Sequence, residues 1–216
     1  MRMQINEMGI AVPTDDHHHP VWIKANGKLA HDEWLLPKIK PYLKRHAVDV
    51  GAHIGTHAIF YAEHSELVSC FEPHPVAFAC LEHNLRKWRN VNLYNVALSD
   101  CDKTVSMVDC PGNLGASQTT EGDDIMCIPL DGMQLNEIDF LKIDAEGDEI
   151  AILNGAAQTL ERYRPVMLVE LNEYAMASRG LTGADLIRCI ESHGYKPQII
   201  DSNQNPKHCD LLCFPG

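Results

Sequence analysis

The chain has 216 residues, a length that fits one domain with a substantial core. Asp and Glu number 30 against 18 Lys and Arg, which gives a formal net charge of -12. A nucleic-acid partner is therefore disfavoured, because such partners need a basic surface that follows the phosphates. No stretch approaches the roughly 20 apolar residues of a membrane span, so a membrane partner is not expected either.

The first sixteen residues contain neither a sustained apolar segment nor a small-residue cleavage site. The eight cysteines form no C-x-x-C pair. Cys209 and Cys213 would share one face of a strand without His or Cys neighbours, so we expect them to pack in the core. These features predict reduced thiols and a cytoplasmic protein.

Residues 1–45 are interpreted as an N-terminal cap on the sheet, with a helix over 31–46, and residues 46–216 as the main domain. From residue 47 onward, apolar runs alternate with helical patterns. The expected strands are 47–50, 67–73, 91–98, 139–144, 166–171, 196–201 and 209–215, and the expected helices are 57–65, 75–88, 149–163 and 183–194.

This alternation implies right-handed crossovers and a mainly parallel sheet that is covered on both faces. The last two strands are separated by seven residues, 202–208, which are too few for a crossover helix. Those strands should therefore be antiparallel neighbours. The predicted fold is α/β and Rossmann-like, with a mainly parallel seven-stranded sheet, a terminal antiparallel hairpin and helices on both faces.

One segment, 104–132, interrupts the alternation. It reads as two short strands around a polar loop at 109–126 that is rich in Gly, Ser and Thr. Such a loop is either an ordinary surface hairpin or a lid or substrate wall at the carboxyl edge of the sheet. The sequence leaves both alternatives open.

The turn "AVDVGAHIGTHA" follows the first of these strands and places Asp49 two residues before Gly51, with Gly55 four residues further on. Ligands of open α/β sheets bind at such strand ends. A dinucleotide requires Gly-x-Gly-x-x-Gly, but His53 occupies the middle position. The Asp49 carboxylate would repel a pyrophosphate and attract an ammonium group. S-adenosylmethionine has that ammonium, has no phosphate, and fits this spacing better than NAD.

Glu72 ends the next strand, 23 residues after Asp49, and is followed by Pro73. An acid at this distance commonly accepts hydrogen bonds from ribose hydroxyls. Each acid alone could simply cap the following helix. Together, at matched strand ends, they favour the cofactor site.

Five segments carry a resemblance to a known family: "VDVGAHIGTHA", "CFEPHPVAFACLEHNL", "NVALSD", "DFLKIDAEGDEIAILNGA" and "RPVMLVELNE". In order and spacing they resemble the FkbM family of S-adenosylmethionine-dependent methyltransferases over about residues 46–175, although His53 stands where the family usually carries Asn. The resemblance implies a class I methyltransferase fold and adenine packing at the end of the third strand. The residues assigned to the cofactor are Asp49, Gly51, Ala52, His53, Gly55, Thr56, Glu72, Pro73, Val96, Ala97, Leu98 and Asp144.

Methyl transfer requires an acceptor aligned with the methyl group, and a hydroxyl acceptor also requires a base. Asp144, at the tip of the fourth strand, and Glu170, at the matching position of the fifth, are the catalytic candidates. With Asn172 they could hold a divalent ion. Glu170 could equally anchor the loop that follows its strand.

The function that the sequence favours is O-methylation of a hydroxyl on a small molecule or sugar, with S-adenosylmethionine as the cofactor. The alternatives are an NAD-dependent oxidoreductase and a non-catalytic module that binds S-adenosylmethionine. We expect a monomer or homodimer whose partner is a small-molecule or glycan acceptor.

Overall fold

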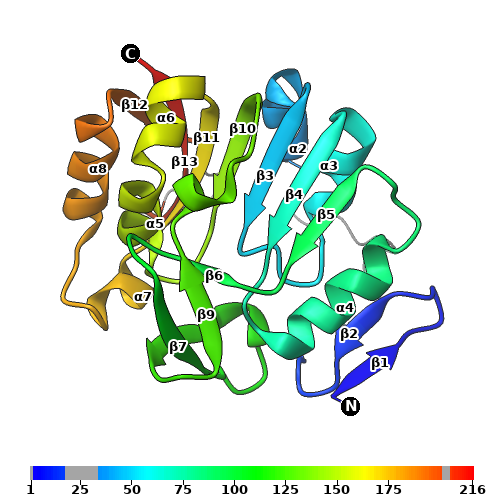
Figure 1. Ribbon diagram of the computed structural model, residues 1–216. Helices are drawn as coiled ribbons and strands as arrows, with labels where there is room; N and C mark the ends of the chain where they lie inside the picture. The colour runs from blue at the N-terminus through cyan, green and yellow to red at the C-terminus, as the bar shows by residue number, and fades with distance from the viewer. Residues whose placement is uncertain (1, 18–33, 201–204) are drawn as a thin grey trace.

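The computed structural model describes residues 2–17, 34–200 and 205–216. Its main element is a seven-stranded sheet with the strand order β12-β13-β11-β10-β3-β4-β5 (Figure 1). Neighbouring strands are parallel except at β13, which is antiparallel to both β11 and β12. The sheet is therefore mixed, and its last two strands in sequence pair as the short connection between them predicts. These strands are β3 (His46–Val50), β4 (Leu67–Phe71), β5 (Val91–Tyr94), β10 (Ile138–Ile143), β11 (Val166–Asn172), β12 (Tyr195–Ile199) and β13 (His208–Pro215).

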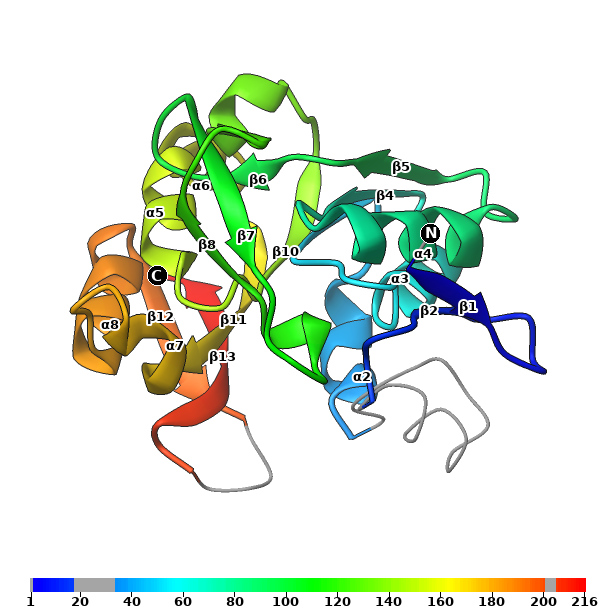
Figure 2. The ribbon, with the colours of Figure 1, turned by 90° about the horizontal axis from the view of Figure 1, so that it is seen from below.

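Helices cover both faces of this sheet (Figure 2). Successive side chains of each strand point to opposite faces of the sheet. In β10, Leu141 and Ile143 pack toward α5, α6 and α8, whereas Phe140 packs toward α2, α3 and α4. The helices are α2 (Leu36–Ile39), α3 (Ala58–His64), α4 (Pro75–Leu85), α5 (Glu149–Gly155), α6 (Ala157–Tyr163), α7 (Glu173–Ala177) and α8 (Gly183–Ser192). The predicted α/β class is confirmed.

The strand predicted at 91–98 is two strands in different sheets. Its first half is β5, and its second half starts a four-stranded sheet of order β6-β9-β7-β8, called here the inserted sheet. The Asn95 side chain fixes the change of direction by donating hydrogen bonds to the carbonyls of Glu72 and Pro73. The inserted sheet comprises β6 (Ala97–Leu98), β7 (Lys103–Val108), β8 (Gln118–Glu121) and β9 (Ile125–Ile128), with 3-10 turns at Leu114–Ala116 and Leu130–Met133.

Two predicted helices are shorter than expected. The segment 149–163 divides at Ala156 into α5 and α6. In the segment 31–46, residues 31–33 lie outside the described residues, and residues 34–45 form only the short helix α2 and a 3-10 turn at Lys40–Tyr42, which contains Pro41. A proline inside a helix removes a backbone donor, so a longer helix is disfavoured here.

The N-terminal segment contributes a hairpin of β1 (Met3–Ile5) and β2 (Ala11–Pro13) that packs on α4. The amide side chain of Asn84 in α4 hydrogen-bonds to both the N–H and the carbonyl of Ala11. All eight cysteines are free, and Cys209 and Cys213 are buried. Among the described residues, no helix has the length and apolar character needed to cross a bilayer.

The close packing of α5 against the inserted sheet can be tested by a substitution at Gly155. A Cβ atom at Gly155 would lie 1.9 Å from the carbonyl oxygen of Ser99, whereas one at Gly132 would meet nothing within 4 Å. We expect Gly155→Ala to lower the free energy of unfolding by about 1–3 kcal/mol, and Gly132→Ala to change it by less than about 0.5 kcal/mol. Urea unfolding measures both values, and equal midpoints would contradict this packing.

Candidate cofactor and acceptor site

A cavity of about 390 Å³ lies at the carboxyl ends of the central parallel strands. Its volume is within the range of small-molecule sites, and its position is the usual ligand position in open α/β sheets. The predicted site residues that line it are Asp49, Gly51, Ala52, His53, Thr56, Glu72, Pro73, Val96, Ala97, Leu98, Asp144 and Glu170. The structure thus brings together residues from five separate segments of the chain.

In the turn after β3, close packing explains why positions 51 and 55 are glycines. Gly51 has a φ angle of 76°, and a Cβ atom there would lie 1.7 Å from the carbonyl oxygen of Asp144. Gly55 is not among the cavity-lining residues, and a Cβ atom there would lie 3.0 Å from Cδ1 of Leu81 in α4. The space that these glycines leave is therefore occupied by the protein's own backbone and side chains.

Glu72 joins the ends of β3 and β4 through its buried carboxylate. Its Oε2 accepts a hydrogen bond of 2.7 Å from the backbone N–H of His53, and its Oε1 accepts one of 2.8 Å from that of His74. His53 has a left-handed φ angle of 49°, within the turn that brings this N–H to Glu72. Burial raises the pKa of Glu72 to about 7, although the two backbone donors oppose the shift.

Lys142 is a site residue that the sequence analysis missed. Its ammonium lies 3.3 Å from Oδ1 of Asp49 and 3.2 Å from Oδ2 of Asp144, and it donates a hydrogen bond of 3.1 Å to the carbonyl of Gly51. The side chains of Lys142 and Asp49 are only 5% and 1% exposed. Lys142 offsets part of the negative charge that we assigned to Asp49. A lysine inside an apolar strand, two residues before Asp144, was the available signal.

The pKa shifts of this group follow from its geometry. Burial alone would lower the pKa of Lys142, but the Asp144 and Asp49 carboxylates outweigh burial and raise it. Burial would raise the pKa of Asp144, but Lys142 outweighs burial and lowers it. The Lys142 ammonium and the Asp144 carboxylate are therefore both charged at neutral pH.

Asp144 of this ion pair and two further acids, Glu146 and Glu170, form a cluster of carboxyl groups. One oxygen from each lies within 4.8 Å of the others. Burial and the charge of Asp144 raise the pKa of Glu146 to about 8, and raise that of Glu170 well above its usual value. At neutral pH, at least one acid of such a crowded group keeps its proton. Nε2 of His208 lies 2.9 Å from Oε1 of Glu170.

Two further residues, Asn172 and His208, contact the acids of this cluster. Asn172, predicted as a possible metal ligand, uses its amide to donate to Glu146 and to accept from the backbone N–H of Ala175. It therefore acts as the N-cap of α7. His208, which the sequence analysis did not select, pairs with Asn172 in the antiparallel register of β13 and β11. Only that register places His208 beside the strand that carries Glu170.

The inserted sheet supplies one wall of the cavity. Met107, Asn113, Leu114, Gly115, Ser117 and Thr119, from β7, β8 and their connection, all line it. The 109–126 loop therefore borders the cavity, and its role as a lid or substrate wall stays a prediction. Asp109 anchors the connection, because it accepts from Nη1 of Arg2 at 3.2 Å and lies 3.0 Å from Nε2 of His74.

Solved structures of methyltransferases that are under 25% identical to this chain share its fold. They include methyltransferase FkbM from Methylobacillus flagellatus KT (17% identity, TM-score 0.58, covering 80% of this chain and 44% of that one). A precorrin-6y C5,15-methyltransferase from Geobacter metallireducens GS-15 has 14% identity, a TM-score of 0.53 and coverage of 87% and 92%. Aeropyrum pernix fibrillarin, with natively bound S-adenosyl-L-methionine, has 12% identity, a TM-score of 0.52 and coverage of 84% and 74%.

The family follows from the sequence itself. Residues 49–197 match the model of the methyltransferase FkbM domain. The chain therefore belongs to the FkbM family of S-adenosylmethionine-dependent methyltransferases. It spans less than half of the Methylobacillus protein. No curated protein matches it at a significant level.

Replacing Lys142 with Met tests the buried ion pair. The variant leaves Asp49 without its cation, so the free energy of unfolding at pH 7 should fall by about 3–5 kcal/mol. Lys103→Met removes only an exposed pair with Asp100 and should cost less than about 0.5 kcal/mol. Urea unfolding of both variants gives the comparison.

The pH dependence of the Lys142→Met variant has a definite sign. In the wild type, the lowered pKa of Asp144 gives stability that is present above its unfolded value and lost as the pH falls through its folded value. Without Lys142, burial raises the pKa of the unpaired carboxylates, so they take up protons as the pH falls. The loss of stability should therefore be smaller at pH 5 than at pH 7, and an equal loss at both would contradict the assignment.

Proposed function

We propose that the protein transfers the methyl group of S-adenosylmethionine to a hydroxyl group of a small molecule or sugar. The observation that carries the proposal is the extent of the cavity, which is lined by Glu72 at one end of the strand edge and by Glu170 at the other. The residues assigned to the cofactor and the candidate bases therefore line the same cavity, as an in-line transfer requires.

The residues fit this cofactor. Glu72 has lone pairs for ribose hydroxyls, Val96 to Leu98 offer an apolar surface for the adenine, and the turn 49–56 borders the methionine end. Within residues 2–17, 34–200 and 205–216, the Asp49 carboxylate makes no hydrogen bond besides its ion pair with Lys142, which leaves acceptor capacity toward the cavity for an ammonium group. When bound, S-adenosylmethionine supplies an electrophilic methyl group on a positively charged sulfur.

Glu170 and His208 form the base in this proposal. As the acceptor oxygen takes up the methyl group that S-adenosylmethionine would supply, leaving the cofactor as S-adenosylhomocysteine, the hydroxyl proton would pass to Glu170 and His208. In its ionised form Glu170 is a stronger base than Asp144, because its pKa is raised whereas that of Asp144 is lowered beside Lys142. Asp144 then anchors the acceptor hydroxyl.

The cofactor role of Glu72 predicts a pH dependence of binding. An ionised carboxylate accepts hydroxyl hydrogen bonds best, and its pKa of about 7 means that the ionised fraction rises strongly between pH 6 and pH 8. Affinity for S-adenosylhomocysteine should rise by up to about tenfold over that range. Calorimetry should find weaker, pH-independent binding for Glu72→Gln. Glu82→Gln, at an exposed position of α4, should match the wild type.

Substitutions in the base pair should separate binding from transfer. Glu170→Gln should slow transfer by about 100-fold or more while cofactor affinity changes by less than about twofold. The assay uses labelled S-adenosylmethionine with a panel of sugars and small alcohols. Tight cofactor binding without transfer to any acceptor would support the non-catalytic module instead. Calorimetric binding of NAD in preference to S-adenosylhomocysteine would support the oxidoreductase.

A divalent cation at Asp144, Glu146 and Glu170 is a second element of the proposal. The three converging oxygens support it, and the Lys142 ammonium beside Asp144 opposes it. Calorimetric titration with Mg²⁺ or Mn²⁺ at pH 8 decides the point. If the cation binds there, Glu146→Gln should abolish the binding and chelation should slow transfer; the absence of both effects would leave Glu170 and His208 as the base without a metal.

A further inference from the structure

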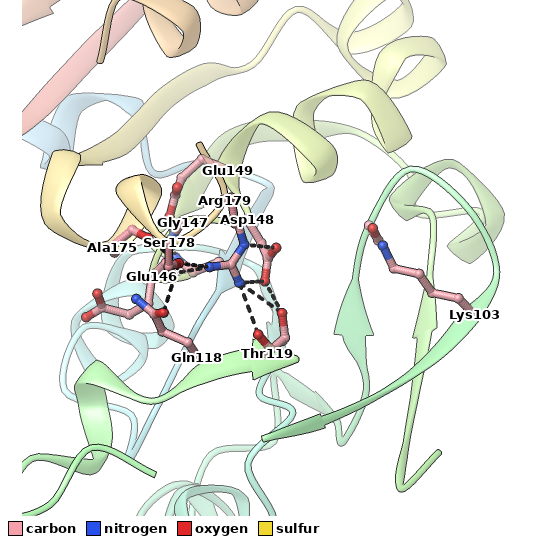
Figure 3. A network of polar contacts seen from close by, with 12 residues as sticks. Lys103, Gln118, Thr119, Glu146, Gly147, Asp148, Glu149, Ala175, Ser178 and Arg179 are labelled. Atoms are coloured by element: carbon pink, nitrogen blue, oxygen red, sulfur yellow. Dashed lines mark hydrogen bonds and ion pairs between the residues drawn. The ribbon is translucent and has the colours of Figure 1, made fainter. Parts of the chain in front are cut away.

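We propose that Arg179 is a positioning residue that holds the inserted sheet in place as the acceptor wall of the site. The effect of Arg179 on methyl transfer rests on the proposed function. Its contacts with the inserted sheet do not depend on that function. Arg179 follows α7 and lies between the turn after β10 and strand β8 (Figure 3). It thus joins three segments that are far apart in the sequence.

Arg179 binds Asp148 through a bidentate ion pair. Nε lies 2.9 Å from Oδ1 of Asp148 and Nη2 lies 2.8 Å from Oδ2. The two side chains are 20% and 22% exposed, so the pair is largely shielded from water. The planar guanidinium matches a carboxylate in this arrangement, and the charge-assisted bonds are stronger than those between neutral groups.

The same guanidinium reaches the inserted sheet. Nη2 donates to Oγ1 of Thr119 at 3.0 Å and is 3.4 Å from its carbonyl oxygen. The Thr119 hydroxyl in turn donates to Asp148. A second link joins Ser178 to Gln118 at 3.2 Å. Because Thr119 and Asp148 both line the cavity, these contacts fix the width of the site between β8 and the turn after β10.

Arg179 also supports the backbone of that turn. Nη1 lies 3.4 Å from the carbonyl oxygen of Glu146, which has a left-handed φ angle of 50°. A Cβ atom at Gly147 would lie 3.0 Å from Nη1, so a glycine there leaves room for the guanidinium. Glu149 holds the other side of the turn by accepting from the N–H groups of Ala145 and Gly147. The Glu146 carboxyl group is thereby kept beside Glu170.

None of these contacts involves the residues assigned to ribose, adenine or methionine. Loss of Arg179 should therefore act on the acceptor half of the site and leave the cofactor half intact. A merely structural residue would affect both halves and the global stability together. This difference separates the two roles.

The test compares Arg179→Met and Arg179→Lys with the control Arg188→Met, whose exposed pair with Asp185 lies on α8. Hydrogen exchange is measured over residues 114–121 with S-adenosylhomocysteine bound, together with calorimetric affinity for that ligand. Arg179→Met should speed exchange there by at least about tenfold, as expected from the loss of one charge-assisted hydrogen bond. The affinity should change by less than about twofold, and the control should match the wild type.

Kinetics complete the test with the best acceptor from the sugar and alcohol panel. KM for that acceptor should rise by about tenfold or more in Arg179→Met, with a smaller change in kcat, and Arg179→Lys should recover part of the loss. Unchanged exchange over 114–121, or a parallel loss of cofactor affinity and of protection throughout the chain, would overturn the proposal. If the wild type methylates nothing in the panel, the proposed function fails, and the exchange and affinity measurements still decide the role of Arg179.

Discussion

The Lys142 ammonium contacts the Asp49 carboxylate, the Gly51 carbonyl and the Asp144 carboxylate, which lie at the ends of the neighbouring strands β3 and β10 and in the turn after β3. Buried carboxylates without a cation would be strongly destabilising, so the position of this lysine determines where both acids can lie. Gly51 fits the same constraint, because the Asp144 carbonyl occupies the place of its missing side chain. The geometry of the cofactor turn and that of the acceptor acids are therefore coupled through one side chain.

On either side of Lys142 the site has a different character. Toward β4 it is held by backbone donors to a single buried acid, Glu72, and bordered by an apolar wall. Toward β11 it is crowded with acids whose pKa values are raised, and it is closed by the inserted sheet and its Arg179 contacts. The first half suits recognition of the cofactor, and the second half suits proton transfer from an acceptor.

Much of the fold could be predicted from the sequence, because buried parallel strands and amphipathic helices leave strong local patterns. The strand ends that carry Asp49, Glu72, Asp144 and Glu170 were located in this way, and the structure brings them to one cavity. The inserted sheet could not be predicted in detail, since a side chain, Asn95, ends one strand and redirects the chain. Residues that depend on cross-strand register, such as Lys142 opposite Asp49, also escape a reading along the chain.

In the proposed function, the cavity at the strand ends holds the cofactor, and the ribose hydroxyls of the cofactor hydrogen-bond to Glu72. A crystal structure of the protein with S-adenosylhomocysteine tests it most directly. Both ribose hydroxyls should lie within hydrogen-bond distance of the Glu72 carboxylate, with the adenine against Val96 to Leu98 and the sulfur facing Asp144 and Glu170. Density for the ligand elsewhere, with the turn after β3 left empty, would contradict it.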